Sequence, residues 1–453
     1  MDERAAVLSV AHEHAARFLA GLPDRPVWPR ATYAEMLAAL GGPLPDVGQD
    51  PVRVVAELAE RADPGLVAIP SGRFFGFVIG GSLPAALGAD WLTSAWDQNA
   101  ALSALTPAAA AAETVSAGWL LDLFGLPTDS GVGFVTGGMM ANFTCLAAAR
   151  RDVLVRAGWD LEARGLVGAP RVRVVVGRYR HDTVDRALRY LGFGRDDVVV
   201  VPTDGEGRVT GDGLAKTLGS VDGPLIVCLQ AGEVHTGAFD AFAEAIPLAH
   251  EHGAWVHVDG AFGLWAAASA PTRHLTAGVA AADSWATDGH KTLNVPYDSG
   301  IAIVARAEAM RAVFGVHADY LVQSTADPME STPEFSRRAR GFPVWAALRS
   351  LGRSGVDALV AGLAANARRM ADGLRALGAE VCNDVCFTQV IARFGDDAAT
   401  EELGTRLLAE GTAVLTPGRW HDRAVLRCSV SNWSTTPDDV DRTLAAVGRL
   451  LRA

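Results

Sequence analysis

The sequence predicts an α/β protein with a large doubly wound domain on a mainly parallel sheet and a smaller α/β domain at its C-terminal end. From about residue 131, short β-branched runs alternate with helical stretches, and after about residue 336 this order changes. The runs are apolar at nearly every position, which is typical of parallel strands covered by helices on both faces. A chain of 453 residues is long enough for one large and one smaller domain.

The elements are expected in the following order. Residues 1–65 form helices interrupted by Pro and Gly, and the Ala-rich segment 83–126 has apolar residues at helical spacing. The strands of the large domain follow, joined by right-handed crossovers. They are predicted at 172–176, 198–201, 225–229, 255–258 and 300–304.

The C-terminal part has a different pattern. A long helical stretch from 336 to about 377 precedes a strand at 388–394, a helix near 400–410, a strand at 425–430 and a last helix from about 437. The expected organisation is an N-terminal helical segment (1–70), a large domain (71–335) and a small C-terminal domain (336–453).

Composition excludes several classes of protein. The net charge of −12 argues against nucleic acid or an anionic membrane as the main partner. No window reaches the roughly 18 apolar residues of a membrane span. The first residues carry acids and histidines where a signal peptide needs an apolar run, so a cytoplasmic location is expected. The five scattered cysteines indicate neither a disulfide framework nor a metal site.

Two segments contain residues suited to covalent and electrostatic chemistry. Lys291 follows a strand-like stretch; it is either an ordinary surface lysine or, if buried, an amine whose lowered pKa makes it a nucleophile for an aldehyde. Asp259 ends the run Trp-Val-His-Val-Asp, at the strand end where α/β sheets place their ligands. Its carboxylate would either cap the next helix or keep a pyridine nitrogen protonated.

Two further segments stand earlier in the chain. His181 follows the 172–176 strand, and it either begins a helix or stacks on a ring and takes part in proton transfer. Gly137 and Gly138 open a helical run, where backbone N–H groups can approach an anion. No Gly-Lys-Ser/Thr follows, so this is not a nucleotide-binding Walker loop.

These segments follow one another along the chain in the order Gly-rich helix start, His181, Asp259 and His290-Lys291. With this combination the chain resembles the group II PLP-dependent amino-acid decarboxylases. This family includes the aromatic amino-acid, glutamate and diaminobutyrate enzymes. The resemblance covers residues 70 to 350 well and the C-terminal part loosely. Segments 71–77 and 237–240 also match the family.

The resemblance implies the fold type I, PLP-dependent transferase-like architecture, with the active site at a homodimer interface. Lys291 would hold pyridoxal 5'-phosphate (PLP) as a Schiff base, and Asp259 would bind the pyridine nitrogen. His181 would stack on one face of the ring and Ala261 would pack on the other. The residues implied for the phosphate are Gly138, Met139, Ser284 and His290.

Several positions depart from the family pattern. Met139 replaces a Ser or Thr, Asp288 stands where many members have Asn, and Val234 stands where Thr is frequent. The family usually carries a tyrosine on a mobile loop, where it protonates the reacting carbon. The corresponding loop, 321–335, contains none, so Tyr320 or His317 takes this role or the reaction ends differently.

The leading hypothesis is a decarboxylase, a lyase of carboxylic acid and amino-acid metabolism that converts an L-amino acid to an amine and CO2. Phe74, Phe77 and Trp96 are expected in the pocket and would suit an apolar or aromatic side chain. The absent loop tyrosine favours an alternative, oxidative decarboxylation–deamination to an aldehyde or a Cα–Cβ cleavage. A non-catalytic relict of the fold is the third hypothesis, and the intact Lys291 and Asp259 argue against it.

Overall fold

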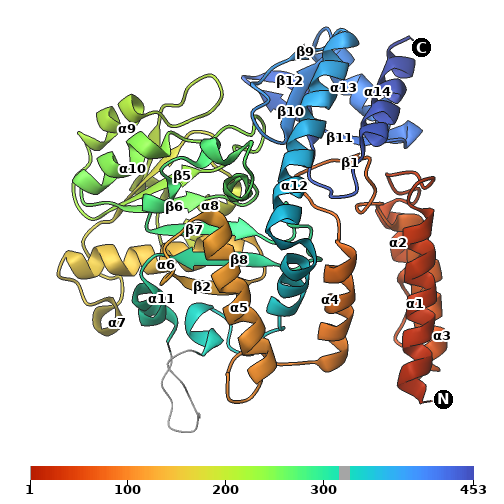
Figure 1. Cartoon of the computed structure of the whole chain (residues 1–453), viewed down its shortest axis with the longest axis horizontal. Coiled ribbons are helices and arrows are strands. Elements are labelled where there is room, and N and C mark those ends of the chain that lie inside the picture. Colours follow the sequence, from red (N-terminus) through yellow and green to blue (C-terminus); the bar gives the residue numbers. More distant parts are fainter. Residues whose placement is uncertain (1, 316–326, 453) are drawn as a thin grey trace.

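The structure, a computed structural model, describes residues 2–315 and 327–452. Figure 1 shows a large α/β body, a second sheet above it and three N-terminal helices along one side. Among the described residues, no helix is both long and apolar enough to cross a bilayer.

The large body is built on a seven-stranded sheet in the order β2-β8-β7-β6-β5-β3-β4. All neighbours pair in parallel except β8, which is antiparallel to both β2 and β7. The connection from β7 to β8, residues 289–299, is too short for the crossover that a parallel pair needs. The strands are β2 (Gly131–Val135), β3 (Arg173–Gly177), β4 (Val198–Val201), β5 (Leu225–Gln230), β6 (Trp255–Asp259), β7 (Ser284–Asp288) and β8 (Gly300–Val304).

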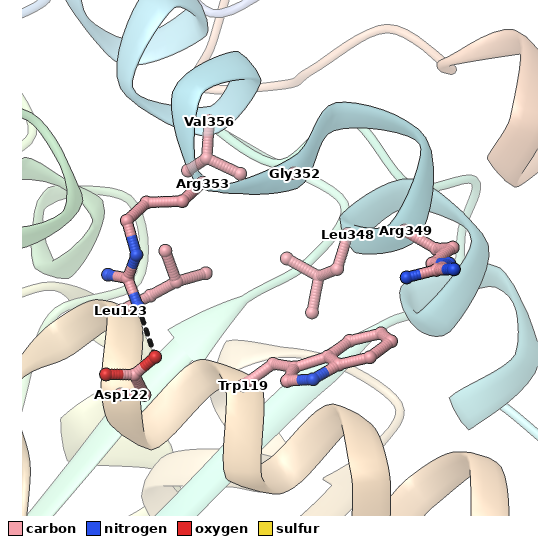
Figure 2. Close-up of a pocket in the computed structure, with 8 residues that line it drawn as sticks. All are labelled: Trp119, Asp122, Leu123, Leu348, Arg349, Gly352, Arg353 and Val356. Carbon is pink, nitrogen blue, oxygen red and sulfur yellow. Dashed lines mark hydrogen bonds and ion pairs between the residues drawn. The ribbon is translucent and has the colours of Figure 1, made fainter.

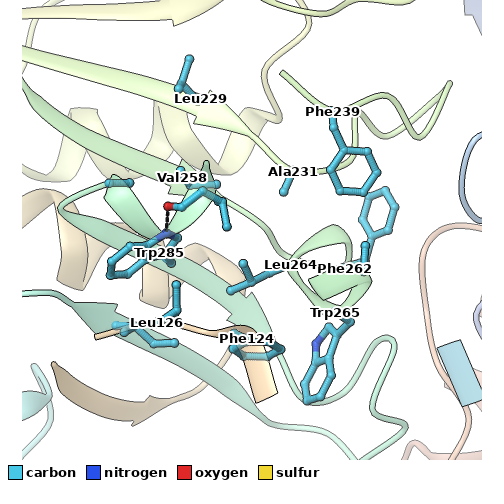
Figure 3. Close-up of a cluster of buried hydrophobic side chains, with 14 of the residues drawn as sticks. Phe124, Leu126, Leu229, Ala231, Phe239, Val258, Phe262, Leu264, Trp265 and Trp285 are labelled. Carbon is cyan, nitrogen blue, oxygen red and sulfur yellow. Dashed lines mark hydrogen bonds between the residues drawn. The ribbon is translucent and has the colours of Figure 1, made fainter. Parts of the chain in front are cut away.

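Two apolar layers cover this sheet, as its double-sided strands predict. Along β3, Val174 and Val176 pack with α6 and α8, whereas Val175 belongs to the cluster on the opposite face. Figure 3 shows part of that second cluster, with Trp265 and Trp285 among its large side chains. Each fully buried large apolar side chain contributes about 1.5–3 kcal/mol to folding.

The helices of the large body include α6 and α8 on one face and α5, α9 and α10 on the other. Their bounds are α4 (Pro84–Trp96), α5 (Pro107–Phe124), α6 (Gly138–Arg156), α7 (Leu161–Arg164), α8 (Asp182–Tyr190), α9 (Gly211–Leu218), α10 (Phe242–Glu251) and α11 (Ala307–Phe314). Short 3-10 helices are η1 (Asp63–Gly65), η2 (Arg195–Asp197), η3 (Gly263–Ala268), η4 (Arg273–Thr276), η5 (Val279–Ala281) and η6 (Pro328–Ser331).

The second sheet has five strands in the order β1-β11-β12-β10-β9. β1, which lies in the range expected for the large domain, pairs in parallel with β11 and so extends this sheet. The strands are β1 (Phe74–Phe75), β9 (Glu380–Val381), β10 (Gln389–Arg393), β11 (Val414–Trp420) and β12 (Arg423–Ser429), and the helices against them are α13 (Asp397–Glu410) and α14 (Pro437–Arg452).

The long helix α12 (Gly341–Ala376) connects the two parts, as Figure 1 shows. Its first half packs against α4 and α5, and its second half against β10 and α14. At Gly352 the backbone leaves the helical conformation, with φ of 62°. Only glycine adopts this left-handed region without steric cost, so Gly352 permits the bend.

The N-terminal helices α1 (Glu3–Gly21), α2 (Tyr33–Leu40) and α3 (Pro51–Ala62) contain no buried residue. Large apolar side chains on them are open to solvent, including Leu37 at 59% and Leu58 at 56% exposure. Arg73 connects the N-terminal segment to the rest of the protein. Its guanidinium group donates to the carbonyls of Pro23, Arg25 and Thr412. These helices therefore lack a core of their own.

Replacing Arg337 by alanine is expected to lower the free energy of unfolding by about 3–5 kcal/mol, because it leaves the buried Glu113 carboxylate unpaired. The two side chains form a bidentate pair, with Nη1–Oε1 of 2.6 Å and Nη2–Oε2 of 2.7 Å. Denaturant unfolding measures the loss. The control is Arg353→Ala, which breaks the exposed pair with Asp122; a comparable loss in that variant would contradict the role of burial.

Candidate active site

Several of the predicted cofactor-site residues lie at the carboxyl ends of β6 and β7. Asp259 is the last residue of β6 and Asp288 the last of β7. The start of α6 lies against the same edge, since a Cβ atom on Gly300 would come within 2.5 Å of the Gly137 backbone. A Cβ atom on Gly138 would lie 2.8 Å from Asp288 Oδ2. Only glycines allow the helix to approach so closely.

Lys291 is largely buried, with its side chain 20% exposed, and so is not a solvated surface lysine. Its Nζ lies 3.0 Å from Asp288 Oδ2. The backbone of Lys291 is also held in place. Its carbonyl accepts from the Asn294 backbone and side chain, and the N–H of Gly80 donates to the carbonyl of His290. The amine is therefore fixed in position at the edge of the sheet.

The anion-binding features lie beside this amine. The first turn of α6 has no side-chain cap, so the backbone N–H groups of Gly138 and Met139 have no capping partner. His290 Nδ1 accepts a hydrogen bond from the N–H of Ser299, so in the neutral ring the hydrogen is on Nε2. The Nε2 atom lies 3.6 Å from Asp288 Oδ1. Burial lowers the pKa of His290, which favours that neutral form.

Two buried polar atoms at this edge have no hydrogen-bond partner among the described residues, Asp288 Oδ1 and Ser299 Oγ. Buried polar groups are almost always satisfied in folded proteins. Their position, beside an uncapped helix start and a buried amine, indicates that a polar ligand completes this region.

Asp259 lies in the middle of this edge of the sheet, at the end of β6. Its Oδ1 accepts from the N–H of Ala261 at 3.2 Å, and its Oδ2 accepts from Asn142 Nδ2 at 3.0 Å. The carbonyl of Ala261 in turn accepts from the N–H of Asp288. Ala261 therefore links the two strand ends, and its expected contact with the cofactor ring stays a prediction. Asp259 caps the local turn and also keeps its carboxylate at the strand edge, so the two sequence interpretations are compatible.

His181 begins α8 as its N-cap and is exposed. Its Nδ1 lies 2.9 Å from Thr183 Oγ1, which accepts from Asn142 Nδ2 at 3.4 Å. The exposed ring is thus connected to Asp259 through two side chains. The structure brings together Lys291, His290, Asp259, Ala261, Gly138, Met139 and His181.

Ser284, expected at the phosphate, lies elsewhere. It is the first residue of β7, about 13 Å along the strand from Asp288. Its Oγ is buried between Trp255 Nε1 and His257 Nδ1, each 2.9 Å away. Ser284 and Lys291 are close in the sequence, which led to the prediction. The extended strand β7 lies between them and keeps them apart in space.

The three rings expected around the substrate are dispersed. Phe74 is buried in a small cluster with Val27 and Val414. Phe77 is exposed, and its N–H donates to Thr416 Oγ1 at 2.7 Å. Trp96 is exposed at the end of α4. His317, Tyr320 and residues 321–326 lie outside the described residues, whereas η6 in the second half of the expected lid is packed, with Met329 3% exposed.

Sequence reasoning missed Asn142 and Arg427. Asn142 stands four residues after Gly138 on the same helix face, and this spacing could have revealed it. Arg427 lies opposite Thr416 in the second sheet; its Nε has no hydrogen-bond partner in the described parts of the chain. Burial lowers the pKa of its guanidinium group. No local pattern marks it, because its position depends on how the two sheets pack.

A separate pocket lies between α5 and the bend of α12 (Figure 2). Trp119 and Leu348 line it, and Arg353 pairs with Asp122 at one side. It contains none of the residues around Lys291. Within 2–315 and 327–452, no group of three or more His, Cys, Asp or Glu side chains is arranged to hold a metal ion.

Comparison with known proteins identifies the family. Residues 40–394 match the model of the pyridoxal-dependent decarboxylase conserved domain. L-2,4-diaminobutyrate decarboxylase of Rhizobium meliloti (strain 1021) is 28% identical over 90% of this chain and 84% of its own length. Aromatic-L-amino-acid decarboxylase of Bacillus atrophaeus is 26% identical, over 87% and 84%.

A solved structure gives the same architecture. Oryza sativa TDC, crystallised with PLP and tryptamine, superimposes with a TM-score of 0.92 at 23% identity, over 100% of this chain and 98% of that one. The type I fold expected from the sequence is thereby confirmed, and the match to the family model confirms the expected PLP cofactor. The chain belongs to the pyridoxal-dependent decarboxylase family.

Proposed function

We propose that the protein uses PLP bound to Lys291 to decarboxylate an L-amino acid, giving an amine and CO2. The observation that carries this proposal is the position of the partly buried Lys291 amine, at one sheet edge with Asp259 and the uncapped start of α6. Family membership supports the reaction class. The substrate and the role of each residue are proposals drawn from the geometry.

The residues fit the aldehyde, the phosphate and the pyridine nitrogen of PLP. The Lys291 amine can bind its aldehyde. The N–H groups of Gly138 and Met139 suit the phosphate, together with His290 Nε2 and the unpartnered Ser299 hydroxyl. Asp259 suits the pyridine nitrogen. When bound, the protonated ring of the cofactor accepts the electrons that the departing carboxylate leaves on Cα.

The protein itself would contribute to the reaction by orienting the bound groups and by placing charge beside them. The Asp259 carboxylate would face the ring nitrogen, and Ala261 and His181 would contact the two ring faces. Because a single conformation of the bound amino acid favours loss of the carboxylate, these contacts act mainly by positioning. Ser284 is omitted from the phosphate site because it lies at the far end of β7.

Arg427 is the side chain best suited to hold a carboxylate of the substrate. Thr416, opposite Arg427, accepts from Phe77 N–H, and the same segment reaches His290 through Gly80. The backbone of Arg427 is therefore two strands from the segment that borders the Lys291 loop, and its unpartnered Nε among the described residues leaves the guanidinium group able to bind a carboxylate. An apolar or aromatic substrate side chain is proposed as expected from the sequence, although Phe77 and Trp96 are exposed and dispersed in the structure.

The test is a substrate screen on the PLP-loaded protein. L-tryptophan, L-tyrosine and L-phenylalanine are compared with L-2,4-diaminobutyrate, L-aspartate and L-glutamate, and CO2 and amine are measured. Turnover of an aromatic amino acid is the expected result. Turnover of diaminobutyrate or an acidic amino acid alone would overturn the substrate proposal and leave the reaction class intact. No CO2 from any of them would overturn both.

A second outcome, oxidation to an aldehyde, is favoured by one observation. Residues 321–335 contain no tyrosine to protonate the reacting carbon. In the oxidative reaction O2 and water are consumed, and aldehyde, ammonia, CO2 and hydrogen peroxide are formed. Measuring peroxide and ammonia beside amine in the same screen separates the two reactions.

We also propose a homodimer. The solvent-exposed apolar residues of α1–α3, such as Leu37 and Leu58, support it, because helices without a buried face need another surface to cover them. A second copy of the chain would supply that surface and close the site at the interface. Sedimentation of the PLP-loaded protein tests this: a monomer at micromolar concentration would overturn it.

Replacing Asp288 by asparagine is expected to tighten PLP binding by about 10-fold or more. The carboxylate is buried beside the start of α6, where the phosphate is proposed to bind, and like charges in such a place oppose each other. Asparagine keeps the shape, removes the charge and frees Lys291 from its ion pair. Titration of the apoprotein with PLP gives the dissociation constant.

The control for this prediction is Asp372→Asn, which removes the same charge from an exposed position on α12. It should leave PLP affinity unchanged. Weaker PLP binding by Asp288→Asn would show that the carboxylate supports the cofactor, contrary to the prediction.

A further inference from the structure

A chain of buried hydrogen bonds runs behind Asp259. Trp255 Nε1 donates to Ser284 Oγ at 2.9 Å, and Ser284 Oγ lies 2.9 Å from His257 Nδ1. His257 Nε2 lies 2.9 Å from Asn142 Oδ1, and Asn142 Nδ2 donates to Asp259 Oδ2 at 3.0 Å. All five residues are buried. These hydrogen bonds link three neighbouring elements of the large domain, β6, β7 and α6.

The chemistry of these groups fixes the direction of every bond. A carboxylate only accepts, so the amide nitrogen of Asn142 faces Asp259 and its oxygen faces His257. His257 Nε2 must then carry the hydrogen. Burial lowers the pKa of His257 to about 4, so the ring is neutral at pH 7 and Nδ1 accepts. Ser284 therefore donates its hydroxyl hydrogen to Nδ1 and accepts from Trp255.

This direction matters because the Asn142 amide could turn over. In the turned orientation its oxygen would face the Asp259 carboxylate and its NH2 group would face the His257 N–H. Both contacts would be repulsive, and two buried hydrogen bonds would be lost. The Nε2–H form of His257, itself selected by the Ser284 hydroxyl, thus holds Asn142 as a donor toward Asp259.

We propose that His257 and Ser284 are positioning residues, which keep the Asn142 amide donating to Asp259 and so hold its carboxylate ready for the ring nitrogen of PLP. This inference rests on the proposed role of Asp259. It gives Ser284 a function distinct from the phosphate contact expected from the sequence. The effect reaches the cofactor only through Asp259, so it should depend on the ring nitrogen.

The experiment compares PLP with 1-deaza-PLP, in which carbon replaces the ring nitrogen. Dissociation constants of both are measured on the apoprotein for wild type, His257→Leu, His257→Gln and Ser284→Ala. We expect His257→Leu to bind PLP about 10-fold more weakly and to bind 1-deaza-PLP as wild type does. His257→Gln places an amide N–H near Nε2 and should restore most of the PLP affinity. Ser284→Ala should show a smaller loss, again for PLP alone.

The control is Trp285→Phe, which removes the buried Trp285–Val279 hydrogen bond in the same sheet without touching this chain. It should not distinguish the two ligands. If His257→Leu weakens both equally, or neither, the positioning role is overturned. If His257→Leu does not fold, Ser284→Ala and His257→Gln decide by the same comparison. Equal binding of both ligands by wild type would instead overturn the proposed role of Asp259.

Discussion

Replacing Lys291 by alanine is expected to lower kcat by about 10^3- to 10^6-fold, the range seen when a covalent catalytic group is removed. The buried amine 3.0 Å from Asp288 is the proposed attachment point of the cofactor. The measurement is borohydride reduction of the PLP-loaded protein followed by peptide mapping. Wild type should carry the reduced cofactor on Lys291, and Lys291→Ala should carry none there.

The sequence offers an unusually clean control, because Lys216 and Lys291 are its only lysines. Lys216 is exposed in the last turn of α9. Lys216→Ala should retain full activity and full labelling of Lys291. Lys291→Arg keeps a positive charge near Asp288 but not a usable amine, and it should be as inactive as the alanine variant. Label found on Lys216 in wild type would contradict the assignment.

Replacing Asp259 by alanine is expected to lower kcat by about 10^2- to 10^4-fold, as for loss of a group that supports proton placement in the site. Without the carboxylate, nothing holds the ring nitrogen in its charged form, and Asn142 loses a buried acceptor. Steady-state kinetics with the best substrate of the screen measure the loss, and PLP affinity should fall with it.

Because Asp259 also accepts from Ala261 N–H, a folding defect has to be separated from a catalytic one. Thermal unfolding of the apoprotein makes that separation, since destabilisation there is independent of cofactor. Asp259→Asn preserves the side-chain shape and should fold, yet it should remain far below wild type in kcat. Full activity of Asp259→Asn would show that the negative charge is not needed.

The sequence predicted the strands whose apolar character is continuous. The runs at β3, β4, β5, β6 and β8 are confirmed within one or two residues. β2 was not predicted, because Gly131 and Gly133 interrupt its apolar pattern. β7 is the strand-like stretch expected before Lys291, but polar residues such as Ser284 and Asp288 gave it no predicted bounds. No strand was predicted in the range of β11, where Pro417 and Gly418 interrupt the apolar pattern. In the structure both residues pair with β12.

The site was predictable where chemistry follows a strand end, as for Asp259, and where a motif matched the family, as for His290 and Lys291. Ser284 could not be placed, because a motif gives order along the chain and not the distance that an extended strand introduces. Arg427 depends on how the two sheets pack, whereas the spacing of Asn142 from Gly138 along α6 could have revealed it. The exposure of Phe77 and Trp96 leaves their expected place in the pocket a prediction.

The contrast between the two lysines has a practical chemical consequence. The Lys291 amine is enclosed and engaged by an acid, whereas Lys216 stands free at the end of α9. An amine-reactive dye or crosslinker would therefore modify Lys216 long before it reached Lys291. The protein can thus be attached to a surface or tagged through Lys216 while its active centre stays chemically untouched.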